Sequence, residues 1–180
     1  MTKALETATL GGGCFWCVEA VVQKLIGVES VVSGYCNGQT ENPTYKSSST
    51  GTTGHYEAVQ IEYDSSKVSY QQLLDVYWKN IDPFDSRGQF CDKGPQYRAA
   101  IFTMNDSEEE LANKSKSVLQ AKLKDKAKVV TEILSAKKFY AAEDYHQDYY
   151  IKNPVRYKYY RYGCGRDKRL EQVEELVNSK

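Results

Sequence analysis

The chain has 180 residues, of which 41% are hydrophobic, and its 24 acidic side chains balance its 24 basic ones. A chain of this length fits one domain with its own core, and we expect residues 1–180 to form a single domain. The charge balance gives no reason to expect nucleic acid as a ligand. The sequence starts without signal-peptide features and contains no run of roughly 18 apolar residues that could span a membrane. We therefore expect a cytoplasmic protein with no membrane association, and a monomer.

The first third of the chain alternates between strand and helix patterns. Residues 6–10 form a short β-type run, and apolar residues at helical spacing predict a helix over 15–26. A strand is predicted over 28–35. Residues 36–54 are rich in Ser, Thr, Asn and Gly, which indicates a long loop, and loops of that length are usually functional. Alternating apolar residues then predict a half-buried strand over 58–63.

The middle of the chain carries two capping-box sequences, in which a serine precedes a glutamine or glutamate by three residues. Ser69 and Gln72 predict a helix that begins there and ends near Asn80. Ser107 and Glu110 predict the start of a second, charged helix. The other predictions for this part are an irregular segment over 82–96, a strand over 99–104, a strand over 128–134, and inward-facing Leu111, Val118 and Leu119 in the charged helix.

The predicted order β-α-β-β-α-β is typical of a split β-α-β (ferredoxin-like) core, in which helices cover one face of a mixed sheet. We therefore predict an α+β fold, a two-layer α/β sandwich around this core, with a long irregular C-terminal region. In that region the tyrosine-rich stretch 145–162 is interpreted as packing. Pro154 is expected to end a helix, and a last helix is predicted over 166–178.

The cysteines form an odd and widely spaced set. In a reducing compartment such a set is more typical of free thiols with redox or catalytic roles than of a disulfide framework. A structural zinc site needs four ligands, whereas this sequence has one C-x-x-C pair and two isolated histidines. We expect no metal and no cofactor. The five cysteines are Cys14, Cys17, Cys36, Cys91 and Cys164.

The stretch GGGCFWCVEA places Cys14 where a predicted strand turns through glycines into a predicted helix. A sulfur there faces unpaired N–H groups and the positive end of the helix dipole, which lower the pKa of a thiol. We interpret Cys14 as a nucleophilic thiolate rather than a small buried hydrophobic residue. Cys17 lies one helical turn later, so general thiol-disulfide exchange between Cys14 and Cys17 is the alternative function.

Two other stretches carry residues that suit acid catalysis. Glu57 stands at the edge of an apolar strand, where burial would raise the pKa of its carboxyl and keep it protonated. It could then act as a general acid. Asp92 and Tyr97 lie on either side of a Gly-Pro turn, just before a predicted strand. His55 is interpreted as structural, and the run 142–150 is assigned no catalytic role.

Together these stretches resemble the motifs of the A-type peptide methionine sulfoxide reductases. The family fold, a two-layer α/β sandwich around a split β-α-β core, agrees with the predicted order of elements. The resemblance covers about residues 8–165. In chain order, the similar segments are Gly13–Trp16, Asn42–Tyr45, Thr53–His55 with Glu57, and Asp92 with Gly94–Arg98.

The resemblance implies reduction of methionine S-sulfoxide, either free or within a polypeptide. By this analogy Cys14 is the nucleophile that attacks the sulfoxide sulfur, and Glu57 donates a proton to the departing oxygen. The hydroxyls of Tyr45 and Tyr97 would polarise the same oxygen. Asp92 would hold this network in place.

The resemblance also implies a small apolar pocket and a second thiol. Phe15 and Trp16 would line the pocket for the S-methyl group. The attack would leave Cys14 as a sulfenic acid, which a second thiol must convert into a disulfide for reduction by thioredoxin, the usual electron donor of the family. The candidates for this resolving thiol are Cys164 first, because it lies between two glycines, then Cys17, with Cys36 and Cys91 left open.

Overall fold

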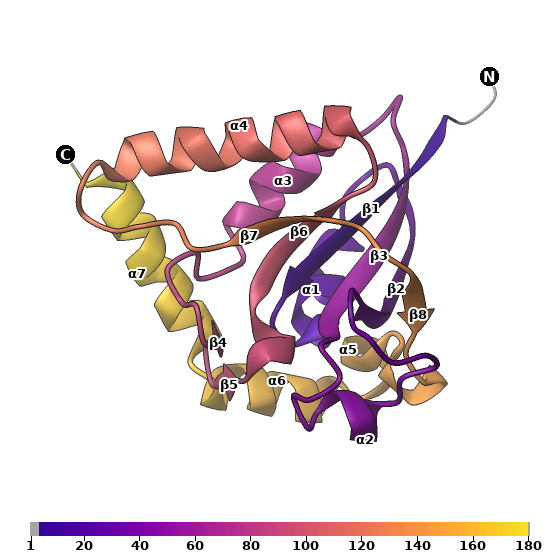
Figure 1. The fold of residues 1–180 in the computed structure, drawn as a ribbon. Coiled ribbons are helices and arrows are strands. Elements are labelled where there is room, and N and C mark those ends of the chain that lie inside the picture. Colours follow the sequence, from indigo (N-terminus) through magenta and orange to yellow (C-terminus); the bar gives the residue numbers. More distant parts are fainter. Residues whose placement is uncertain (1–3, 180) are drawn as a thin grey trace.

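A mixed sheet of six strands forms the centre of the protein (Figure 1). The structure, a computed structural model, describes residues 4–179. The strands are β1 (Leu5–Gly12), β2 (Val28–Cys36), β3 (Tyr56–Asp64), β6 (Ala99–Thr103), β7 (Glu132–Ser135) and β8 (Phe139–Ala141). Their order is β7-β6-β1-β3-β2-β8; β7 runs parallel to β6, and the other neighbouring pairs are antiparallel. The predicted α+β class with a mixed sheet is confirmed.

Three helices contribute to the main core with the sheet: α1 (Phe15–Val22), α3 (Tyr70–Trp78) and α4 (Asp106–Leu123). Side chains alternate between the two faces of a strand, so every second residue of β1 and β3 points toward this core. Leu10 of β1 and Ile61 of β3 are fully buried there together with Leu74 of α3. A smaller, separate cluster surrounds Phe102 of β6. Helices packed on a mixed sheet give the predicted two-layer sandwich.

Within the C-terminal third, residues 149–160 pack beside the start of α1 (Figure 1). Tyr157 in this region is buried against Cys14 and Cys17. Short elements also form within the predicted loops, next to the same end of the sheet. The remaining elements are α2 (Tyr45–Ser48), β4 (Gly88–Gln89), β5 (Asp92–Lys93), the 3-10 turns Pro95–Tyr97 and Asp144–His146, α5 (Tyr149–Lys152), α6 (Pro154–Gly163) and α7 (Arg166–Asn178).

The start and the buried face of α4 differ from the prediction. Its N-cap is Asn105, whose side chain accepts a hydrogen bond from the backbone N–H of Glu108, and not Ser107. Asparagine caps helices as well as serine does, and Asn105 is closer to the end of β6 at Thr103 than Ser107 is, so the helix begins earlier. Val118 is 51% exposed. The buried residues of α4 are Ala112, Ser115 and Leu123.

Three other predicted boundaries are wrong for local reasons. The first helix ends at Val22 and not at Ile26, since the chain turns at Gly27, which has φ +102°. The strand predicted over 128–134 begins later, because the N–H of Val130 donates to the carbonyl of Pro83 instead of a neighbouring strand. Pro154 begins α6 instead of ending a helix, a position where its missing N–H costs nothing.

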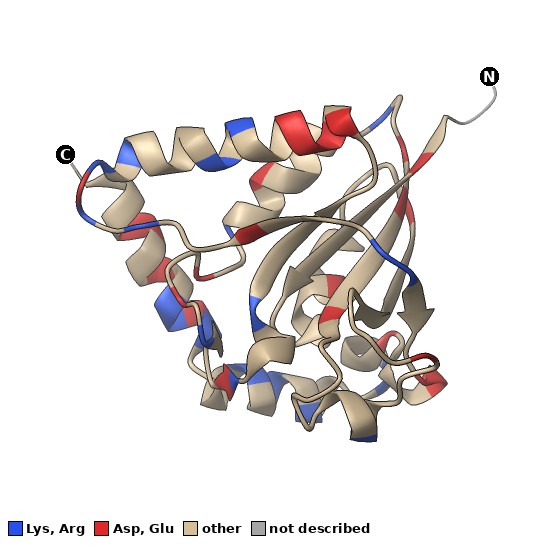
Figure 2. Ribbon diagram, viewed as in Figure 1, with Lys and Arg blue, Asp and Glu red and all other residues tan. Residues whose placement is uncertain are grey.

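Charged residues of both signs are interspersed over the fold (Figure 2). In α4 the first turn carries Asp106, Glu108 and Glu109 and the last turn carries Lys122, which is the distribution that the helix dipole favours. Within residues 4–179, none of the helices has the length and apolar character needed to cross a bilayer.

Candidate active site

Cys14 lies at the junction of β1 and α1. It is the N-cap residue of α1, and its carbonyl accepts the N–H of Cys17. Gly13 before it has φ +79°, and a Cβ at this position would lie 2.5 Å from the Cβ of Gln89. Only glycine fits both the left-handed backbone and this close approach. The strand therefore turns directly into the helix and presents the sulfur at the helix start.

Cys14 is 6% exposed, and it lines a small cavity that is partly open to solvent. Five separate stretches of the chain contribute to this cavity. Seven of the residues singled out in the sequence line it, and Cys17 and Cys164 do not. The lining residues are Cys14, Phe15, Trp16, Tyr45, Glu57, Asp92, Tyr97 and Tyr160.

Glu57 of β3 is next to the start of α1. Its side chain is 3% exposed, and Oε2 accepts a hydrogen bond of 3.2 Å from the backbone N–H of Phe15. Burial raises the pKa of the carboxyl to about 8, assisted by the negative charge of Asp92 and opposed by the Phe15 N–H. At neutral pH the carboxyl is mainly protonated, which is the state required of a proton donor. Burial also raises the pKa of Tyr45 and of Tyr97, so both hydroxyls stay protonated beside it.

The two thiols of the C-x-x-C pair belong to one buried cluster, and each alters the pKa of the other. Contrary to the expectation from the helix dipole, the pKa of Cys14 is raised, first by burial and then by its interaction with Cys17. The pKa of Cys17 is lowered, first by its interaction with Cys14, against the effect of burial, and then by the charges of Arg166 and Arg161. The pair therefore loses its first proton readily. Transfer of the remaining proton from Cys14 to Cys17 would produce the Cys14 thiolate with no change in net charge.

The aromatic wall of the cavity is assembled with the help of the run 142–150. Trp16 donates from Nε1 to Nδ1 of His146 at 3.0 Å, and the ring of Tyr149 stacks on the indole at 3.8 Å with an angle of 6° between the planes. The backbone N–H of Tyr45 donates to Oε2 of Glu143 at 3.1 Å. Residues that received no role from the sequence thus fix the positions of two lining side chains.

Residues 6–177 match the sequence profile of the protein family described as "Peptide methionine sulfoxide reductase". The chain belongs to this family. It is 49% identical over 167 residues to "Peptide methionine sulfoxide reductase MsrA" of Listeria welshimeri, which covers 92% of this chain and 94% of the relative. It is 50% identical over 166 residues to the protein of the same name from Bacillus subtilis, with the same two coverages of 92% and 94%. This chain is therefore a methionine sulfoxide reductase of the A type.

Solved structures support the same assignment. Mxr1 from Saccharomyces cerevisiae in reduced form superposes with a TM-score of 0.78 and 33% identity, over 84% of this chain and 87% of that one. The yeast protein in complex with Trx2 matches with a TM-score of 0.57 and 24% identity, over 81% of this chain and 84% of that one. At that identity the second match supports the fold alone.

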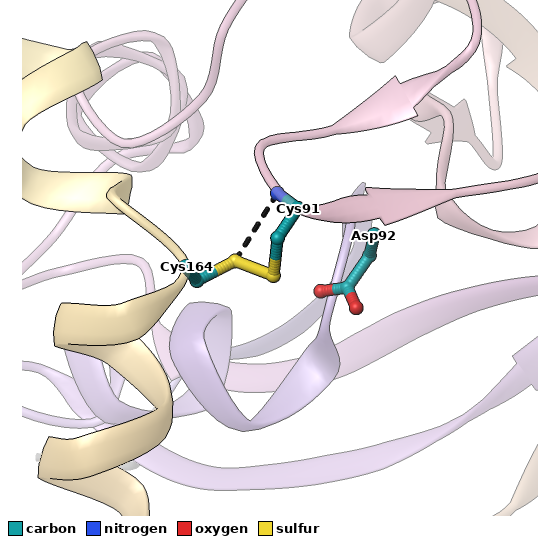
Figure 3. Close-up of side chains that lie close together, drawn as sticks. All are labelled: Cys91, Asp92 and Cys164. Carbon is teal, nitrogen blue, oxygen red and sulfur yellow. Dashed lines mark hydrogen bonds between the residues drawn. A yellow bond between two sulfur atoms is a disulfide. The ribbon is translucent and has the colours of Figure 1, made fainter.

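In this reductase Cys164 forms a disulfide with Cys91, with Cα atoms 4.9 Å apart (Figure 3). The expectation of five free thiols is therefore wrong. Cys164 is at the C-terminal end of α6, and the left-handed Gly165 then turns the chain into α7, which leaves the sulfur opposite the turn between β4 and β5. The two sulfurs and a carboxylate oxygen of Asp92 lie within 4.8 Å of one another. Because the sulfurs are bonded to each other, this group does not provide thiolate ligands for a metal.

The other predicted residues lie away from the cavity. Cys36 is 1% exposed within the smaller core cluster, where burial raises the pKa of its thiol. The ring of His55 accepts the N–H of Gly38 through Nδ1, and its Nε2 lies 2.7 Å from the carbonyl oxygen of Thr40. The imidazole thus fastens the long loop after β2, which is a structural role.

Sequence reasoning missed Tyr160 as a lining residue. Its hydroxyl donates to Oδ2 of Asp92, and its ring meets the edge of Trp16 at 5.7 Å. The one available signal was the density of tyrosines over 145–162, which packing explains equally well. Nothing in the spacing of His146 or Tyr160 indicates their contacts with Trp16.

Proposed function

We propose that this reductase acts on methionine S-sulfoxide, free or in oxidised proteins, with Cys14 as nucleophile and Glu57 as proton donor. The observation that carries the proposal is that a sulfur and a buried, mainly protonated carboxyl line the same small cavity. Thiol-disulfide exchange expels no oxygen, and therefore needs no donor to protonate one. Phe15 and Trp16 supply the apolar surface suited to the S-methyl group.

The proposed reaction transfers the sulfoxide oxygen to Cys14. The Cys14 thiolate attacks the sulfoxide sulfur, and the sulfoxide oxygen takes up the proton of Glu57 while Tyr45 and Tyr97 donate hydrogen bonds to it. The S–O bond of the substrate breaks and the product thioether departs. The methionine is reduced by two electrons, and Cys14 is oxidised to a sulfenic acid.

Cys17 is the better-placed resolving thiol. Its backbone N–H donates to the carbonyl of Cys14 at 3.1 Å, the two residues share one buried cluster, and its lowered pKa favours its thiolate. Cys164, first candidate from the sequence, is already bonded to Cys91. Attack of the Cys17 sulfur on the Cys14 sulfenic acid forms the S–S bond and breaks the S–O bond, and the proton that Cys17 received from Cys14 leaves with the hydroxyl as water. The yeast relative, which in its reduced form is 33% identical to this chain, has been solved in complex with Trx2, and by analogy we infer that a thioredoxin reduces that disulfide.

Mass mapping after a single turnover tests this proposal. One equivalent of methionine S-sulfoxide is added to the reduced enzyme, and the products are digested and analysed. We expect one methionine per enzyme and a new disulfide between the peptides of Cys14 and Cys17, whereas the Cys14→Ser variant yields neither. Methionine R-sulfoxide is the control. Turnover by Cys14→Ser, or no product from the wild type, would contradict the proposal.

A further inference from the structure

Glu19 is a fully buried carboxyl in the middle of α1 that plays no part in the reaction described above. It follows Trp16 by three residues, its side chain is 0% exposed, and it does not line the cavity. Burying a carboxyl is costly unless it is hydrogen-bonded. Its position close behind the catalytic turn therefore calls for a partner.

The partner is the backbone of Asp148. Oε1 of Glu19 accepts the N–H of Asp148 at 3.1 Å, and Gln23, the C-cap residue of α1, donates to Oδ1 of Asp148 at 2.9 Å. Asp148 has φ +54° and ψ 32°, a left-handed conformation that is uncommon for residues other than glycine. Two side chains, one in α1 and one at its C-terminal end, thus hold Asp148 in this conformation.

This conformation determines where the neighbours of Asp148 lie. His146, two residues earlier, accepts the indole N–H of Trp16, and Tyr149, the next residue, stacks on the indole ring. Trp16 itself lines the cavity. A continuous set of contacts therefore runs from Glu19 through Asp148 to His146 and Tyr149, two of the aromatic partners of Trp16.

We propose that Glu19 is a positioning residue for the substrate-binding wall: it fixes Asp148 so that His146 and Tyr149 hold the Trp16 indole in place. The inference rests on the proposed function, in which Trp16 contacts the S-methyl group. Burial raises the pKa of Glu19 to about 7, and Asp148 and Lys152 are the charged groups that act on it with opposite signs. Protonated or ionised, the carboxyl accepts the N–H, so a glutamine suffices.

Steady-state kinetics with methionine S-sulfoxide provide the first test. We expect Glu19→Ala to raise KM by roughly 10-fold with kcat within about 3-fold of the wild type, since binding is lost and the reacting groups remain. Glu19→Gln should stay within about 2-fold in both constants. Gln23→Leu, at a partly exposed position, should raise KM by about 3-fold. Equal damage by Glu19→Gln and Glu19→Ala would overturn the proposal.

Fluorescence of Trp16 provides a test that needs no substrate. Trp78 is first replaced by phenylalanine, which leaves Trp16 as the only tryptophan. Glu19→Ala should change the emission intensity and wavelength of Trp16, because its stacked and hydrogen-bonded partners are released. This readout separates a failure of the positioning role from a failure of the proposed function.

Ser115→Ala serves as the matched control for stability. Ser115 is 7% exposed; its hydroxyl donates a hydrogen bond to the carbonyl of Ala112 and accepts one from the indole N–H of Trp78. It is not among the residues that line the cavity. The Ser115→Ala substitution should lower the unfolding midpoint and leave KM unchanged. If Glu19→Ala likewise lowers only the midpoint, with KM and Trp16 emission unchanged, Glu19 is a packing residue and the proposal is wrong.

Discussion

The hydroxyl of Tyr160 donates a hydrogen bond to Asp92, and both side chains line the cavity that contains Cys14. Burial raises the pKa of Asp92, and the Tyr160 bond opposes this shift. Tyr160 therefore helps Asp92 to stay ionised in a setting that disfavours its charge. It comes from α6, more than sixty residues after Asp92 in the sequence.

Tyr160→Phe should raise the pKa of Asp92 further, because it removes the donor and leaves the ring. We expect kcat/KM for methionine S-sulfoxide to fall by roughly 10-fold, equal to about 1.4 kcal/mol. Steady-state kinetics measure the loss. Tyr159→Phe is the matched control, since Tyr159 is 80% exposed on the same helix. Equal effects of the two substitutions would assign the loss to α6 as a whole.

The rate of methionine formation should fall as pH rises through about 8, the pKa of Glu57, because only the protonated carboxyl can donate. Single-turnover rates between pH 6 and 10 measure this decrease. Glu57→Gln should retain partial activity without the decrease, since an amide can donate a hydrogen bond at every pH. Glu57→Asp should be slower, because the shorter side chain misplaces the proton. A wild-type rate independent of pH would contradict a Glu57 proton donor.

Stability should depend on the same carboxyl. The folded pKa of about 8 lies above the ordinary value of 4.5, so folding favours the protonated form. The contribution is fully present below pH 4.5, is lost as pH rises, and is gone above about 8. As pH rises over this interval, the free energy of unfolding of the wild type should therefore fall relative to that of Glu57→Gln. Urea unfolding at several pH values measures the difference, and parallel curves would refute a raised pKa.

Cys17→Ser should separate the chemical step from the recycling step. One methionine per enzyme should still form, but Cys14 should remain a sulfenic acid that dimedone traps, and multiple turnover with thioredoxin should fall at least about 10-fold. Mass spectrometry of the adduct gives the measurement. Cys36→Ser, which removes a thiol buried elsewhere, should behave as the wild type. A normal turnover of Cys17→Ser would transfer the resolving role to another cysteine.

Gly13→Ala should impair both folding and activity. The substitution places a Cβ on a left-handed backbone and against Gln89, and we expect a loss of about 2 kcal/mol or more in the free energy of unfolding. Activity should fall further, since Cys14 is displaced. Gly163→Ala is the control, because its Cβ would meet no atom within 4 Å and alanine favours a helix. Urea unfolding and turnover distinguish the two variants.

The elements that the sequence predicted well are those governed by neighbouring residues. Ser69 and Gln72 do form a reciprocal capping box at the start of α3, and α7 has the predicted bounds. The capping box predicted at Ser107 does not form, because Asn105 provides an equivalent N-cap nearer to the preceding strand. Local patterns identify candidates, and the surrounding fold selects among them.

The site residues that belong to sequence motifs could be predicted, whereas those that join the site through contacts distant in sequence could not. Cys14, Glu57 and Asp92 belong to separate motifs, and the fold brings all three to one cavity. The bond from Trp16 to His146 joins residues 130 positions apart, and no periodicity reports contacts of that kind. The Cys91–Cys164 pairing, 73 positions apart, was one of many combinations that five cysteines permit.

The wall around Cys14 draws on Tyr149 and Tyr160, which follow Cys14 in the sequence by more than a hundred residues. Synthesis runs from the N-terminus, so a growing polypeptide contains this sulfur well before it contains the rings that enclose it. Until α5 and α6 have been made and have packed against α1, the Cys14 thiol lacks this part of its shielding from solvent.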